Sequence, residues 1–138
     1  MTNDLMKARD ILDTGGYTCV VCKDDTVFTA TERGVKPLLD WVNVQQNLSG
    51  FSAADRVVGR ATAYLYVLLG VKEIYAGVMS RPASLVLQAH GIGAYPGILV
   101  DGIINRKGTG PCPFEAAVMD ITDPQQALET IRQKAAAL

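Results

Sequence analysis

The sequence predicts an α/β fold, a three-layer α/β/α sandwich on a mixed β-sheet. Helical and β-type patterns alternate along most of the chain, which favours parallel strands joined by helical crossovers. Near the N-terminus, two β-type segments instead follow each other across Asp24-Asp25, which predicts an antiparallel hairpin. Because neither a repeat nor a linker divides residues 1–138, we interpret them as one domain.

The first part of the chain reads as a helix, a hairpin and a second helix. Apolar residues recur at helical spacing over residues 1–12, and the glycines at 15–16 end that helix. The segments YTCVVCK and TVFTAT are rich in β-branched and aromatic residues, so residues 17–23 and 26–31 are predicted strands. Residues 34–46 carry an amphipathic pattern that tolerates Pro37 in its first turn.

The longest predicted helix covers residues 52–69, SAADRVVGRATAYLYVLL. It is apolar nearly all round, which is typical of a central buried helix, and Gly70 closes it. Shorter elements follow. We expect strands over 73–79 and 94–101, and helices over 82–88, 113–120 and 124–138.

Composition and charge exclude several classes of protein. The chain is 49% hydrophobic and 20% charged, which indicates a globular protein, and its net charge of −1 predicts no nucleic-acid partner. The longest apolar run, residues 63–69, is too short for a bilayer, so we expect no membrane association. Three cysteines and an N-terminus unlike a signal peptide favour the cytoplasm and reduced thiols.

Asp55 is the first candidate catalytic residue. Ser52 and Asp55 fit the S-x-x-D pattern of a capping box, in which each side chain bonds the backbone amide of the other residue. Alternatively, Asp55 is a carboxylate at a positive helix end, suited to acid/base chemistry or to hydrogen bonds with a substrate. Both interpretations stay open, and Ser52 is a candidate ligand-binding residue beside it.

Arg56 and Arg60 stand four apart and would share one face of this helix. Their side chains either reach solvent, bind an anion together, or pair with Asp55 or Glu115. Arg60 is a candidate ligand-binding residue. Gly59 lies between them and costs about 1 kcal/mol relative to alanine inside a helix. We therefore expect another backbone or a ligand to approach it closely.

Cys112 is the second candidate catalytic residue, within the segment RKGTGPCPFE. Pro113 predicts a helix that begins after Cys112 and places Glu115 where its carboxylate could bond back to the Cys112 amide. The helix end favours a thiolate, whereas the nearby carboxylate opposes it. Cys112 is thus either an activated nucleophile or only the residue that starts a helix.

The residues around Cys112 could hold a small anion. Two cationic residues lead into a glycine-rich turn whose amides could cradle the anion. From this segment we predict ligand contacts from Arg106, Thr109, Gly110 and Glu115.

The sequence predicts neither a metal site nor a cofactor. Cys19 and Cys22 form a C-x-x-C pattern, but residues three apart on a strand point to opposite faces. His90 is the only histidine, and no zinc-type spacing surrounds it. The glycines at 91–97 fail the dinucleotide-binding fingerprint, because their spacing is too long and they follow a helix.

Three stretches together resemble an uncharacterised prokaryotic family, domain of unknown function 1893. They are LDTGGYTCVVCKDDTVFTATERGVKPLLDW, GFSAADRVVGRATAYLYVLLGVKEIYA and RKGTGPCPFEAAVMDI. The resemblance implies a cytidine-deaminase-like fold, in agreement with the predicted order of elements. It also implies a pocket where helix N-termini converge, at Ser52 and near residues 80–82, which adds Ser80 and Arg81 to the predicted ligand-binding residues.

The resemblance also implies that the zinc ligands of that fold are missing. Zinc enzymes of the fold carry His-Ala-Glu at the start of the central helix and Pro-Cys-x-x-Cys at the next. Residues 53–55 and 82–86 stand in the corresponding places, and among these only Asp55 and Pro82 keep any of the pattern. We therefore expect a protein that is not a zinc deaminase.

The sequence is compatible with three functions. The first is the binding of a small nucleotide-like or anionic ligand. The second is a thiol-dependent enzyme that transfers sulfur or acyl groups through Cys112. The third is a non-catalytic homodimer formed through apolar helix faces.

Overall fold

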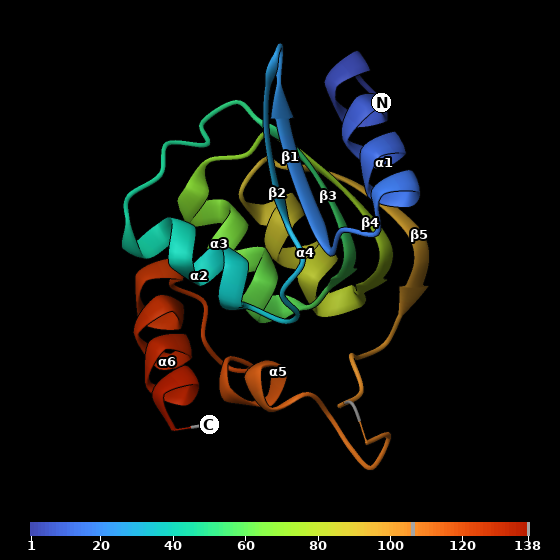
Figure 1. Cartoon of the computed structure of the whole chain (residues 1–138). Helices are drawn as coiled ribbons and strands as arrows, with labels where there is room; N and C mark the ends of the chain where they lie inside the picture. The colour runs from blue at the N-terminus through green and yellow to red at the C-terminus, as the bar shows by residue number, and fades with distance from the viewer. Residues whose placement is uncertain (106, 138) are drawn as a thin grey trace.

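The computed structural model describes residues 1–105 and 107–137 (Figure 1). This part of the chain forms six helices and five strands. In chain order they are α1 (Asn3–Gly15), β1 (Cys19–Lys23), β2 (Thr26–Ala30), α2 (Lys36–Asn43), β3 (Ser52–Val58), α3 (Arg60–Leu69), β4 (Glu73–Ser80), α4 (Arg81–Ala89), β5 (Gly93–Val100), α5 (Pro113–Ala117) and α6 (Pro124–Ala136).

The five strands form one mixed sheet in the order β2-β1-β3-β4-β5. β1 is antiparallel to both of its neighbours, whereas β3, β4 and β5 are parallel to one another. Helix α1 covers one face of the sheet, and α2, α3 and α4 cover the other, with α6 packed against α3 (Figure 1). The predicted three-layer α/β/α sandwich on a mixed sheet is confirmed.

The N-terminal half confirms the predicted helix and hairpin. α1 ends at Gly16, whose φ of 71° is the left-handed conformation that glycine adopts readily. Asp24-Asp25 connects β1 and β2, and Cys22 faces Val27 across the antiparallel pair. Helix α2 is shorter than the predicted 34–46, and Pro37 stands in its first turn as expected.

The prediction of one helix over residues 52–69 is wrong. Residues 52–58 form the central strand β3, and the helix begins only at Arg60. Because β1 and β4 flank this strand and helices cover both of its faces, most of its side chains are apolar. A short apolar run of this kind has no period that distinguishes a buried strand from a buried helix.

Three smaller predictions depended on that helix and are also wrong. Ser52 and Asp55 do not form a capping box, because neither begins a helix. Arg56 lies in β3 and therefore shares no helix face with Arg60. Gly59 is not inside a helix but is the extended residue that precedes α3.

Two apolar clusters lie on the two sides of the sheet. The larger one fills the space between the sheet and α2, α3, α4 and α6, and it includes the fully buried Tyr66. The smaller one packs α1 against β1 and β3. Cys19 belongs to the larger cluster and Cys22 to the smaller, on opposite faces as their spacing predicts.

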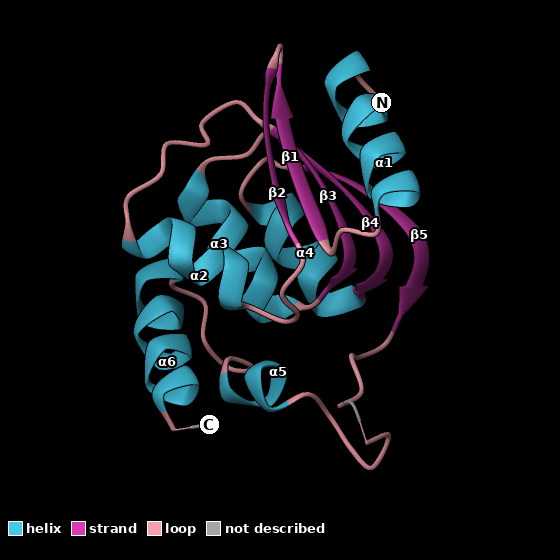
Figure 2. Cartoon of the chain, in the orientation of Figure 1, coloured by secondary structure: helices cyan, strands magenta, loops and turns pink. Residues whose placement is uncertain are grey.

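The C-terminal part of the chain lies beside the helical layer. Figure 2 shows a long loop connection after β5, followed by the short α5 and then by α6. No helix among the described residues is long and apolar enough to cross a lipid bilayer.

Candidate functional site

The candidate site lies at the edge of the sheet where the parallel strands β3, β4 and β5 end, which we name the carboxyl edge. Their arrowheads point toward the side on which α5 lies (Figure 1). Open α/β sheets commonly bind their ligands at such an edge. Helices α3 and α4 begin there, after Gly59 and Ser80.

Ser80, a predicted ligand-binding residue, caps helix α4. Its side chain is fully buried, and its hydroxyl accepts a hydrogen bond from the amide of Ala83 at 3.1 Å. A serine cap satisfies one of the free amides at a helix start. The hydroxyl of Ser80 is thus engaged by the protein itself.

Asp55 belongs to a chain of three hydrogen-bonded side chains. Tyr66 of α3 donates its hydroxyl proton to Asp55 Oδ2 over 2.7 Å. The same hydroxyl oxygen lies 3.0 Å from Cys19 Sγ. Cys19 and Asp55 face each other across the antiparallel β1–β3 pair, so the backbone register brings them together. We name Cys19, Tyr66 and Asp55 the polar triad.

Burial raises the pKa values of all three side chains of the polar triad. It raises the pKa of the Asp55 carboxyl to about 6, although the hydrogen bonds from Tyr66 and from the amides of Val57 and Arg56 lower it. Burial also raises the pKa of the Cys19 thiol and of the Tyr66 hydroxyl, and the charge of Asp55 raises both further. Asp55 therefore changes protonation close to neutral pH, as groups that exchange protons with a ligand do.

Glu115 reaches from α5 to the start of α3. Its Oε2 accepts a hydrogen bond from the Arg60 amide at 2.7 Å, and its Oε1 accepts one from the Ala61 amide at 3.1 Å. A carboxylate is favoured there by the free amides and the positive end of the helix. The predicted bond from Glu115 to the Cys112 amide is wrong, because that amide donates to Ile103 O at 2.9 Å.

Gly59 makes room for this carboxylate. A Cβ at position 59 would overlap Glu115 Oε1. The sequence predicted close approach to Gly59 by a backbone or a ligand, and the group that approaches is the Glu115 side chain.

The guanidinium group of Arg60 holds the segment that follows α5. Its Nε donates to Val118 O at 3.0 Å, and its Nη2 donates to Ile121 O at 2.6 Å. Tyr64 also donates its hydroxyl to Ile121 O at 2.6 Å. Arg60 does pair with Glu115, but through its backbone amide, and its side chain anchors the C-terminal part of the chain.

Ser52 lies away from the carboxyl edge. It is the first residue of β3, and a strand rises about 3.3 Å per residue, so the length of the strand separates Ser52 from Gly59. Its hydroxyl donates to Glu73 Oε2 at 2.6 Å, and Thr2 bonds the same oxygen. The predicted convergence of a helix start at Ser52 with that of α4 is wrong, because α3 begins after Gly59 instead.

The glycine-rich turn before Cys112 forms its own hydrogen bonds. The Thr109 amide donates to Asn105 Oδ1 at 3.0 Å, and the Gly108 amide donates to Asn105 O at 3.0 Å. The Gly110 carbonyl accepts from the Asn105 amide at 2.8 Å. The amides of residues 108 and 109 are thus not free for an anion, contrary to the prediction.

The remaining predicted residues lie apart from the polar triad. Arg81 forms an exposed ion pair with Asp101 at 2.8 Å. Cys112 is half-buried and precedes α5, as predicted, but its side chain does not cap that helix. The predicted contact from Arg106 lies outside the described residues.

Sequence reasoning missed Tyr66 and Cys19 as partners of Asp55. Tyr66 lies in a segment so apolar that it indicated only core. A correct assignment of β3 would have indicated these partners. On a strand, Asp55 shares a sheet face with the buried Ala53, so its carboxyl needs a hydrogen-bonding partner from the helix that packs on that face.

Two hollows border helix α2, and neither is lined by a predicted site residue of the described ranges. The first has a volume of ≈ 340 Å³ and lies against the end of β2 and Trp41. The second, of ≈ 460 Å³, lies between the start of α2, α5 and the end of α6. Asp40 borders both.

The residues that the resemblance aligned with a zinc motif do not begin a helix. Residues 53–55 lie in β3, whereas Gly59-Arg60-Ala61 stands at the start of α3, so that alignment is wrong. Pro82 does stand in the first turn of α4, as expected. Over residues 1–105 and 107–137, no three His, Cys, Asp or Glu side chains gather so that they could hold a metal ion.

Comparisons with known proteins identify the family. The profile of the domain of unknown function DUF1893 matches residues 7–135. The crystal structure of a DUF1893 family protein from Thermotoga maritima superposes with a TM-score of 0.89 and 24% identity, over 97% of this chain and 91% of that one. No curated protein matches by sequence.

A second solved structure is a diaminohydroxyphosphoribosylaminopyrimidine deaminase/5-amino-6-(5-phosphoribosylamino)uracil reductase from Thermotoga maritima. It is similar at a TM-score of 0.43 and 14% identity, over 83% of this chain and 40% of that one. The family profile spans nearly the whole chain, and the DUF1893 structure shares its fold. The chain belongs to the DUF1893 family.

Proposed function

We propose that this protein binds a small nucleotide-like or anionic molecule at the carboxyl edge, with Asp55 as its protonatable contact. The observation that carries the proposal is the polar triad, in which a half-buried carboxyl with a pKa of about 6 is bonded to the Tyr66 hydroxyl. A carboxyl tuned in this way can accept a proton from a ligand or donate one to it. Asp55 stands three residues before the end of β3, and the ends of parallel strands are the usual place for such a ligand.

Thermal-shift measurements against nucleosides, nucleotides and small anions test this proposal. We expect at least one ligand to raise the melting temperature of the wild type, because a ligand that binds only the folded state stabilises it. The shift should be lost in Asp55→Asn and kept in the control Asp13→Asn, since Asp13 lies exposed at the end of α1. A panel without any shift, or a shift that persists in Asp55→Asn, contradicts the proposal.

A second candidate function is association into a homodimer, and strand β5 favours it. Within residues 1–105 and 107–137, β5 is an edge strand that pairs with β4 alone, and its sequence GAYPGILV contains no charged residue. The Ile98 side chain on it is 62% exposed. An uncharged edge of this length can add a strand, and Pro96 removes one backbone donor from the part of the edge where it stands. We therefore propose the β5 edge as the dimer surface, whereas the sequence suggested apolar helix faces.

Light scattering of the wild type and of Ile98→Lys at micromolar concentration tests the dimer. A dimeric wild type and a monomeric variant support it, because lysine on an edge strand opposes pairing. A monomeric wild type contradicts it.

We also propose that the protein resides in the cytoplasm. Cys19 and Cys22 are free thiols separated by the sheet, and Cys112 is also free. Free thiols of this kind suit a reducing compartment. Detection of the tagged protein in a secreted fraction would contradict this assignment.

A further inference from the structure

The hollow between α2, α5 and α6 has an apolar floor. The buried Val35 and Leu39 and the half-buried Phe114 line it, together with Ala135 and Ala136 near the end of α6. Because alanine carries only a methyl group, these two positions leave open a space that larger side chains would fill. The volume of ≈ 460 Å³ is within the range of small-molecule sites, which is about 300–1,000 Å³.

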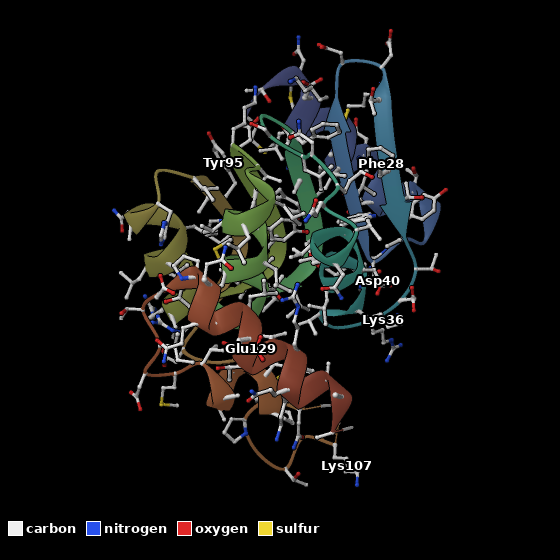
Figure 3. All side chains as sticks on the ribbon, turned by 90° about the vertical axis from the view of Figure 1, so that its left-hand side faces the viewer. Phe28, Lys36, Asp40, Tyr95, Lys107 and Glu129 are labelled. Atoms are coloured by element: carbon white, nitrogen blue, oxygen red, sulfur yellow. The ribbon has the colours of Figure 1, made fainter. Side chains whose placement is uncertain are left out.

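The rim of this hollow carries charge. Lys36 Nζ lies 2.9 Å and 3.2 Å from the two carboxylate oxygens of Asp40, and Figure 3 shows both side chains together on α2. This pair is locally neutral. Arg33 also lines the rim, and it forms no ion pair with any residue of the described ranges. The Glu32 carboxylate also acts on Lys36, so Arg33 is distinguished as a rim cation that no carboxylate of the described ranges holds in an ion pair.

We propose that this hollow binds a small amphipathic monoanion, whose apolar body lies on the Val35, Leu39 and Phe114 floor and whose anionic group bonds Arg33. Apolar walls with a few placed polar groups are the usual composition of a small-molecule site. The guanidinium group suits a carboxylate, because its paired N–H donors match the two carboxylate oxygens. This site is independent of the one proposed at Asp55, since that residue does not line the hollow.

Four small molecules separate the contributions of the ligand's apolar body and of its charge to the binding affinity. Phenylacetate carries both, phenylacetamide keeps the body without the charge, phenethylammonium inverts the charge, and acetate lacks the body. We expect phenylacetate to shift the ¹H–¹⁵N NMR signals of residues 33–39 and of Phe114 in a saturable titration. Phenylacetamide and phenethylammonium should bind at least about tenfold more weakly, because a hydrogen bond to a charged group is worth roughly a factor of ten or more. Acetate should also bind at least about tenfold more weakly, because it has no apolar body to bury.

Two variants and a matched control make the titration decisive. Arg33→Gln should weaken phenylacetate binding about tenfold and remove its advantage over phenylacetamide. Ala136→Leu should abolish binding by filling the hollow while the spectrum stays folded. Arg9→Gln removes a guanidinium from α1, on the other face of the sheet, and should leave binding unchanged.

Several outcomes overturn this inference. One is a titration in which phenylacetate moves no signals around the hollow. The others are equal shifts from acetate and phenylacetate, or unchanged binding in Arg33→Gln. Asp55→Asn should bind phenylacetate as the wild type does, so that failure at this hollow and failure of the site at Asp55 are distinguished.

Discussion

The Glu115 carboxylate fills the space that a side chain at Gly59 would occupy. Its two oxygens accept the first amides of α3, and the Arg60 side chain reaches back to the carbonyls that follow α5. Hydrogen bonds therefore join the start of α3 to the segment around α5 in two ways, since each segment supplies a side chain that bonds the backbone of the other. The free amides at the start of α3 are thus occupied by the protein's own carboxylate.

Gly59→Ala should destabilise the protein by about 2 kcal/mol, because the new methyl group displaces Glu115 and leaves two helix amides without their acceptor. Backbone strain does not contribute, since φ at Gly59 is −99°. Urea denaturation followed by circular dichroism measures the loss. Gly102→Ala is the matched control, because a Cβ there meets no atom within 4 Å. Equal stability of the two variants would contradict the close contact.

Glu115→Ala should cost about 1–3 kcal/mol through loss of the same charge-assisted bonds. In the Glu115→Ala background, the methyl group of Gly59→Ala no longer overlaps a carboxylate, so the second substitution should cost little. The double variant should therefore be clearly more stable than the sum of the two single losses predicts. Additive losses in a double-mutant cycle would show that the two residues act separately.

The sequence was sufficient for the fold class but not for this contact. The hairpin and the crossovers follow from local periodicity and from turn residues such as Asp24-Asp25. Both of these signals lie within a few neighbouring residues of the sequence. The assignment of β3 failed because a strand buried on both faces carries no alternating pattern. The pairing of Glu115 with Gly59 joins residues 56 positions apart, and periodicity holds no information about such a contact.

Asp55 was selected as a candidate from its residue type, but the helix start predicted around it was wrong. A capping box would have placed its carboxylate on a backbone amide at a helix start. The structure instead brings it to Tyr66 and Cys19, because β-sheet register and the packing of α3 on the sheet decide its neighbours. Local sequence determines a cap, whereas tertiary packing determines the polar triad.

Asp55→Asn should increase the stability of the protein at pH 8. The folded-state pKa of about 6 lies above the ordinary aspartate value of about 4, so the folded state favours the protonated carboxyl. The contribution of Asp55 to the free energy of unfolding is therefore full below pH 4, and it is lost as the pH rises through 6. At pH 8 the charged form destabilises the fold by about 1–3 kcal/mol, and asparagine carries no such charge.

Urea denaturation of the wild type and of Asp55→Asn between pH 4 and pH 8 measures this difference. The gap in stability should widen with pH and level off above about pH 7. Asp13→Asn should show no such widening. A constant gap between Asp55→Asn and the wild type would mean that Asp55 titrates normally and would remove the basis for its proposed role in proton exchange.

The three thiols should differ sharply in their reaction with iodoacetamide. Cys19 is 3% exposed and Cys22 is fully buried, and burial raises the pKa of both thiols, so both should resist alkylation in the folded protein. Cys112 is only half-buried and should react first. Mass spectrometry at pH 7.5 should find one modification under native conditions and three in urea, with none in native Cys112→Ser. The rate at Cys112 decides the thiol-enzyme alternative: if it does not exceed that of a model thiol, Cys112 is not an activated nucleophile.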